Sequence, residues 1–144
     1  MPGLVSHALG ASPVLLTDRP MVAQLVDDGL AANRLPAADV RALDFEWNAE
    51  AAHALKAEHL GGKAPDVILA CDCIFAPLFG SSFLLLEMLC ALAAVETTTT
   101  LLALERRYDD GAEAFFEQAT AAGFASTVQL RCARVLVVEM VRLR

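Results

Sequence analysis

Acidic and aromatic residues follow several apolar runs of this sequence, and they are the side chains best suited to ligand chemistry. They are Asp18, Phe45 to Trp47, Asp72 and Glu105. A carboxylate in such a place can accept hydrogen bonds from ribose hydroxyls or from an ammonium group, and Trp47 can offer a flat face to an aromatic base. These residue types favour a nucleoside-bearing cofactor as the ligand.

Apolar runs and helical periodicities alternate along the chain and predict the elements that position these side chains. Strands are predicted at residues 13–18, 40–45, 65–72 and 97–104, with two more at 125–130 and 134–142. Helices are predicted at residues 20–33, 48–60, 81–95 and 110–123. Asp110 and Glu113 have the spacing of a capping box, with Asp110 in the cap position.

The order of these elements predicts an α/β fold. Strands that alternate with helices form a doubly wound, Rossmann-like sheet, mostly parallel, and the last two strands form a C-terminal antiparallel hairpin. Such sheets bind ligands at the carboxyl ends of their strands, where the acidic residues lie. The 144 residues match the size of one domain, so residues 1–144 are expected to form a single domain.

Composition and charge exclude several functional classes. With 56% hydrophobic and 20% charged residues, the chain is not intrinsically disordered. Its 11 basic and 18 acidic residues give a net charge of −7, which opposes binding to nucleic acid or to a membrane surface and favours a basic partner.

The cellular location is predicted from apolar segments and cysteines. No apolar run reaches the roughly 18 residues of a membrane span, and the N-terminus lacks the basic region of a secretory signal. Cys71, Cys73, Cys90 and Cys132 lie among apolar neighbours and are interpreted as reduced thiols. The expected location is the cytoplasm, with the nucleus as a second compartment.

Other arrangements of reactive side chains favour structural roles. Cys71 and Cys73 have no second pair at ligand spacing, so no metal site is expected. Arg106 and Arg107 are interpreted as solvated or paired with Glu105 and Asp109 rather than catalytic.

Asp18 and Trp47 each have a structural alternative. Asp18 can satisfy free amides at the start of the helix near Pro20, and Trp47 can cover the sheet edge as a core aromatic.

The segments at residues 16–18, 40–47, 66–75 and 105–107, followed by the helix with Phe115 and Phe116, together resemble a known family. The chain is similar to the seven-β-strand S-adenosylmethionine-dependent methyltransferases. Within them it resembles the lysine-directed protein methyltransferases of the methyltransferase-like 21 type, which carry an Asp-x-x-Tyr motif after their fourth strand. The likeness covers almost the whole chain.

The resemblance implies S-adenosyl-L-methionine as the cofactor and a protein with a target lysine as the substrate. Asp18 would bind the ribose hydroxyls, Trp47 would flank the adenine and Cys71 would line the cofactor cleft. Gly3 looks like the last glycine of the family's glycine-rich loop.

The Asp-x-x-Tyr motif corresponds to Asp72 and Phe75. Asp72 would orient the methionine end of the cofactor or the incoming amine. Phe75 replaces the tyrosine of the motif, so the hydrogen bond of that hydroxyl cannot be made here.

A second departure concerns the start of the family's cofactor domain. In the family, a strand and most of a glycine-rich loop come before the glycine that corresponds to Gly3, and this sequence begins at Met1 without them. That strand lies, in the family's sheet, between the strand ending at Asp18 and the strand ending at Asp72. A sheet without it exposes unpaired backbone groups. The sequence is therefore interpreted as an incomplete gene model, as an alternative product or as a short protein that borrows a strand from a partner chain, and incompleteness is favoured.

Two alternatives to the enzyme remain open. One is a non-catalytic interaction module, or an inactive fragment, that keeps the fold without the cofactor loop. The other is a nicotinamide-dinucleotide fold, although no Gly-x-Gly-x-x-Gly follows any predicted strand.

Overall fold

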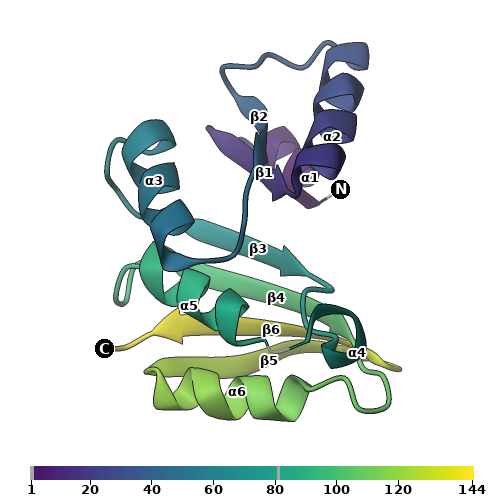
Figure 1. Ribbon diagram of the computed structural model, residues 1–144, viewed down its shortest axis with the longest axis vertical. Helices are drawn as coiled ribbons and strands as arrows, with labels where there is room; N and C mark the ends of the chain where they lie inside the picture. Colours follow the sequence, from purple (N-terminus) through teal and green to yellow (C-terminus); the bar gives the residue numbers. More distant parts are fainter. Residues whose placement is uncertain (1, 81) are drawn as a thin grey trace. The chain divides into compact units, whose positions relative to one another are not determined.

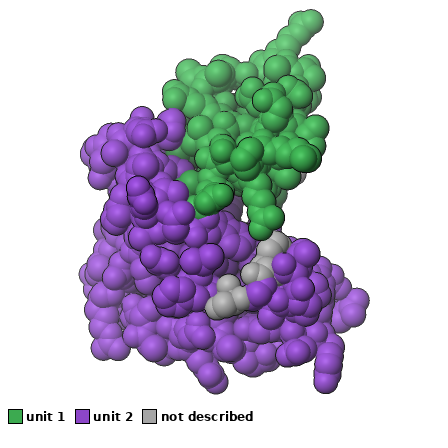
Figure 2. Space-filling view, viewed as in Figure 1, with its two compact units in different colours: residues 1–46 green, residues 47–144 purple. Residues whose placement is uncertain are grey.

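The computed structural model describes residues 2–80 and 82–144 and divides into two compact units (Figure 2). Unit 1 comprises residues 1–46 and unit 2 comprises residues 47–144.

Unit 1 is a pair of parallel strands with two helices (Figure 1). Its elements are α1 (Pro2–Ala8), β1 (Val14–Asp18), α2 (Pro20–Ala32) and β2 (Val40–Asp44). Pro20 begins α2 because its missing N–H is not needed in the first turn of a helix. The buried core of the unit joins both strands and α2 through Val14, Leu30 and Val40.

The helix α1 was not predicted from the sequence, and Gly3 lies in its first turn. A Cβ atom at Gly3 would collide with Cδ2 of Leu16 and would lie 3.4 Å from Cγ1 of Val14. Gly3 therefore lets α1 approach β1 closely, which is a known use of glycine where a helix packs on a strand.

Unit 2 is a four-stranded mixed sheet with four helices in the described residues (Figure 1). Its helices are α3 (Ala49–His59), α4 (Ala76–Phe79), α5 (Phe83–Leu92) and α6 (Ala112–Ala121). Its strands are β3 (Val67–Cys71), β4 (Thr99–Glu105), β5 (Phe124–Cys132) and β6 (Val135–Arg142). The strand order is β3-β4-β6-β5, in which β3 and β4 are parallel and β6 is antiparallel to both of its neighbours.

The core of unit 2 lies on one face of this sheet. Burial alternates along β4, where Thr100, Leu102 and Leu104 point into the core. The helix α5 contacts both α3 and α6, and α6 contacts β5. No helix in residues 2–80 and 82–144 is both long enough and apolar enough to cross a bilayer.

The carboxyl end of α5 is held by two cations from other elements. Lys56 Nζ donates to the carbonyl of Ala91 at 2.5 Å, and Arg142 Nη1 donates to the carbonyl of Cys90 at 2.5 Å. Because the last carbonyls of a helix carry partial negative charge, both contacts stabilise the helix end.

The α/β class and the C-terminal antiparallel hairpin are confirmed, and the described strands form two parallel and two antiparallel pairs. Besides α1, three details differ from the prediction. A short helix, α4, precedes α5. The cap position of α6 is Gly111 rather than Asp110. The hairpin turns at Ala133 and Arg134, after β5 has continued to Cys132.

Phe115 and Phe116 provide a test of this core. Phe115 is 0% exposed and packs edge to face on the half-buried Phe116, with ring centroids 5.4 Å apart. We expect Phe115→Ala to lower the free energy of unfolding by about 3–5 kcal/mol, because it leaves a cavity in the core. The control Phe116→Ala should cost about 1–2 kcal/mol. Urea unfolding measures both, and equal losses would contradict the placement of Phe115 in the core.

Candidate functional site

Asp72 lies directly after β3, at the carboxyl end of the parallel strand pair. Its backbone N–H donates to the carbonyl of Ala103 at 2.7 Å, which extends the pairing with β4 by one residue. Its φ of 53° lies in the left-handed region, which aspartate tolerates better than most residues with a side chain. The strand pairing thus fixes the place from which the carboxylate projects.

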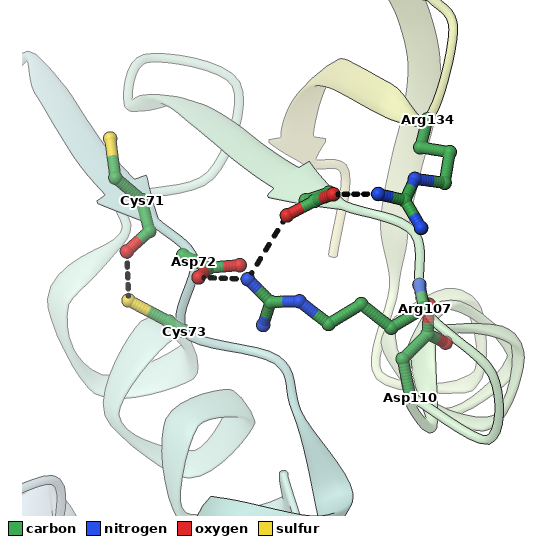
Figure 3. A network of polar contacts seen from close by, with 7 residues as sticks. Cys71, Asp72, Cys73, Arg107, Asp110 and Arg134 are labelled. Carbon is green, nitrogen blue, oxygen red and sulfur yellow. Dashed lines mark hydrogen bonds and ion pairs between the residues drawn. The ribbon is translucent and has the colours of Figure 1, made fainter.

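Arg107 contacts both residues of the predicted Asp-x-x-Phe motif, Asp72 and Phe75, and Figure 3 shows its ion pair with Asp72. Its Nη2 atom lies 2.8 Å from Oδ2 of Asp72, and its guanidinium carbon lies 4.9 Å from the ring centroid of Phe75. The hydrogen bond to Asp72 raises the pKa of Arg107 above its usual value, so the guanidinium stays charged. The structure therefore brings Asp72 and Phe75 together around one cation.

Glu105 and Arg134 extend this group of charges. Glu105 Oε2 lies 3.3 Å from Nη2 of Arg107, and Glu105 Oε1 lies 2.9 Å from Nη2 of Arg134 at the tip of the β5–β6 hairpin. The backbone N–H of Arg106 also donates to the carbonyl of Arg134 at 2.7 Å. An ion pair and a backbone hydrogen bond therefore connect the hairpin tip to the end of β4.

Asp110 is the buried anchor of the loop between β4 and α6. It is 1% exposed, and its Oδ2 atom accepts from Nε of Arg106 and from the N–H of Arg107, both at 2.8 Å. Its Oδ1 atom accepts from the N–H of Ala112 at 2.9 Å. Burial alone would raise the pKa of the Asp110 carboxyl, but these hydrogen bonds outweigh burial and hold the pKa below its usual value.

The same loop contacts the start of α4, directly after Phe75. The carbonyl of Asp110 accepts from the N–H of Ala76 at 3.0 Å. Gly111 has a φ of 80°, and a Cβ atom there would lie 3.1 Å from Cβ of Ala76. The Asp110 anchor thus holds both the loop that carries Arg107 and the segment that carries Phe75.

Asp18 is the exposed last residue of β1, in unit 1. Its Oδ1 atom accepts from the N–H of Arg19 at 2.8 Å, so the structural alternative for this carboxylate is realised in part. In the part of the chain that the structure describes, no donor reaches its Oδ2 atom. One carboxylate oxygen at the end of a parallel strand pair is therefore available to a hydroxyl group.

The remaining predicted cofactor residues lie in both units. Gly3 belongs to unit 1, whereas Trp47 and Cys71 belong to unit 2. Trp47 is half-buried and directly precedes Asn48, whose side chain caps α3 by accepting from the N–H of Ala51 at 2.7 Å. Cys71 is exposed at the end of β3 and beside Asp72. An exposed thiol at a strand end fits the lining of a ligand cleft.

The arginine pairings differ in part from the prediction. Arg107 pairs with Glu105 as expected and also with Asp72, whereas Arg106 pairs with Asp110 and Glu113 rather than with Asp109. Sequence reasoning treated Asp110 as a helix cap and missed its burial. The four-residue spacing from Arg106 to Asp110 was the signal that could have found the pair. Residues 2–80 and 82–144 contain no group of three side chains placed to hold a metal ion.

The chain belongs to the lysine methyltransferase family, whose model matches residues 2–122. It is also 33% identical over 127 residues to secreted RxLR effector protein 48 of Plasmopara viticola, in an alignment that covers 80% of this chain and 63% of that protein.

The fold is similar to the crystal structure of ribosomal protein L11 methylase from Lactobacillus delbrueckii subsp. bulgaricus. The TM-score is 0.60 at 20% sequence identity, over 99% of this chain and 65% of that one. The chain therefore spans slightly less than two thirds of each of these two proteins. The expected resemblance to methyltransferases is confirmed in family and in fold.

The substitution Asp110→Asn tests whether the buried carboxylate of Asp110 stabilises the folded chain. Because the folded-state pKa of Asp110 is lowered, its stabilisation is complete above the unfolded pKa of about 3.9 and is lost as the pH falls through the folded pKa. We expect the variant to lose roughly 1.5–3 kcal/mol of unfolding free energy at pH 7. The difference from the original chain should shrink below about pH 4. Urea unfolding across this pH range measures it.

The matched control is Asp109→Asn, at the neighbouring exposed carboxylate. Asparagine tolerates the positive φ of 53° at this position, so we expect little change. Equal effects of the two substitutions would contradict the role of Asp110.

Proposed function

We propose that this chain provides the cofactor-binding and substrate-positioning residues of an S-adenosylmethionine-dependent methyltransferase that modifies lysine on a protein substrate. The main support is the family match over residues 2–122. In this proposal residues 1–144 belong to one methyltransferase domain of the methyltransferase-like 21 type.

The proposed cofactor residues are those that the resemblance to the methyltransferases implies. Oδ2 of Asp18 would accept from a ribose hydroxyl, Trp47 would lie against the adenine, and Cys71 would line the cleft. The first turn of α1, at Gly3, would approach the methionine end. The cofactor supplies an electrophilic methyl group on a sulfonium centre.

Asp72 and Phe75 would position the lysine. A carboxylate at the strand end attracts the cationic side chain, and the aromatic ring packs on its apolar stem. Methyl transfer requires the amine nitrogen to approach in line with the sulfonium methyl, and positioning supplies much of the acceleration of such a reaction. The net charge of −7 also favours a basic protein as the substrate and disfavours nucleic acid and membranes.

A partner chain that donates a strand is part of the proposal. In the described residues β1 pairs only with β2, and β3 pairs only with β4, so each keeps a free edge. Val67 and Leu69 of β3 are 54% and 37% exposed. A strand from a partner would satisfy the backbone groups of such an edge and cover these side chains.

The same free edge favours a second candidate, an interaction module without catalysis. The absence of the tyrosine hydroxyl at Phe75 is consistent with it. One relative of this chain, secreted RxLR effector protein 48, is named as an effector.

We propose the cytoplasm, and also the nucleus, as the location. All four cysteines are free, two of them exposed, and exposed thiols stay reduced in these compartments. Imaging of a fluorescently tagged chain tests this, and exclusive secretion would contradict it.

Isothermal titration with S-adenosylhomocysteine tests the cofactor site, after circular dichroism has shown that each variant is folded. We expect saturable binding by the original chain and at least about tenfold weaker binding by Asp18→Ala, because a charge-assisted hydrogen bond to ribose is lost. The control Asp27→Ala removes an exposed carboxylate from α2 and should bind normally.

Unchanged affinity of Asp18→Ala would remove Asp18 from the site. If the original chain is folded but does not bind S-adenosylhomocysteine, the result would contradict the proposed enzymatic function and support the interaction module.

A further inference from the structure

The guanidinium of Arg107 occupies a place that suits organic cations in general. It lies between the carboxylates of Asp72 and Glu105 and over the ring of Phe75. Carboxylates and aromatic faces both attract ammonium and guanidinium groups. These three side chains therefore form a cation site, and Arg107 is its occupant.

Arg107 is held firmly at its backbone and weakly at its guanidinium. Its N–H donates to the buried carboxylate of Asp110. At the other end a single nitrogen, Nη2, serves both Asp72 and Glu105, and the side chain is 31% exposed. Among the described residues no acceptor reaches Nε or Nη1. An exposed ion pair through one nitrogen is weaker than a two-nitrogen fork, so the guanidinium can leave while its backbone stays fixed.

The charges of the site favour an exchange of one cation for another. Asp72 and Glu105 contribute two negative charges, and Arg107 and Arg134 contribute two positive ones. When the guanidinium of Arg107 leaves, the site keeps one uncompensated negative charge. A single alkylammonium group restores the balance.

We infer that Arg107 is an internal competitor of the substrate, whose guanidinium must leave the site of Asp72, Glu105 and Phe75 before a substrate alkylammonium group can enter. The identity of that cation as a lysine side chain rests on the proposed function. The competition itself is a property of the residues in this chain.

The test is a titration of the full isotope-labelled chain with n-butylammonium, which has the ammonium group and the four-carbon stem of lysine. The NMR signals of residues 72–75 report binding. We expect Arg107→Ala to bind this probe about tenfold more tightly than the original chain, the gain expected if Arg107 fills the site about nine-tenths of the time. n-Butanol, the neutral analogue, should show no gain.

Arg134→Ala is the matched control. It removes the same charge from the same group but leaves the contacts of Arg107 with Asp72 and Phe75 in place. We therefore expect a much smaller gain from it. Arg107→Lys keeps a competing cation and should bind as weakly as the original chain, and adding Asp72→Asn to Arg107→Ala should cancel the gain.

The inference is overturned if Arg107→Ala binds no more tightly than the original chain, if neither binds detectably, or if Arg134→Ala gains as much. Should Arg107→Ala fail to fold, Arg107→Gln removes the charge while keeping a polar side chain of similar length, and the same outcomes apply.

This titration contains no cofactor, so it separates the inference from the proposed function. A gain in n-butylammonium affinity by a chain that does not bind S-adenosylhomocysteine supports the competition and overturns the proposed enzyme. Binding of S-adenosylhomocysteine without any gain in n-butylammonium affinity supports the proposed enzyme and overturns the competition.

Discussion

The buried carboxylate of Asp110 is the interaction on which the candidate site in unit 2 depends. It satisfies backbone N–H groups at Arg107 and Ala112, and it pairs with the guanidinium of Arg106. Its own carbonyl reaches the start of α4. A charged group in the core is costly unless it is paired and hydrogen-bonded, and here the donors are Arg106, Arg107 and Ala112. Asp110 therefore holds the loop after β4 through its side chain and the loop after β3 through its backbone carbonyl.

The two loops have different tasks in this arrangement. The pairing of β3 with β4 sets the position of Asp72, because its N–H continues the ladder of the strands. The loop after β4 contributes Arg107, whose guanidinium pairs with Asp72 at the end of β3. The strands therefore fix the position of Asp72. The side chain of Arg107, whose backbone is held in place, determines what the Asp72 carboxylate contacts.

Much of the fold could be predicted from the sequence, because its main signals are local. The apolar run before Asp72 forms the strand β3, although Val67 and Leu69 stay exposed, and the helical spacing after Pro20 forms α2. Asp72 could be assigned to a strand end for the same reason. The burial of Asp110 could not be predicted, because two consecutive aspartates normally indicate an exposed segment. Only the folded structure brings Arg106 and the start of α4 next to Asp110. The contact of Arg107 with Phe75 joins residues far apart in sequence and has no local pattern.

The position of β6 in the sheet has a consequence for how unit 2 folds. The strand β4 has β3 on one side and β6 on the other, although β6 is made about thirty residues later than β4. During synthesis β4 must wait with one edge unpaired until β6 has left the ribosome, and at ordinary rates of about 5–20 residues per second this takes seconds. The charge pair between Glu105 and Arg134 also forms only then. The sheet of unit 2 is therefore complete only after β6 has been made, and β4 keeps one exposed strand edge during that interval.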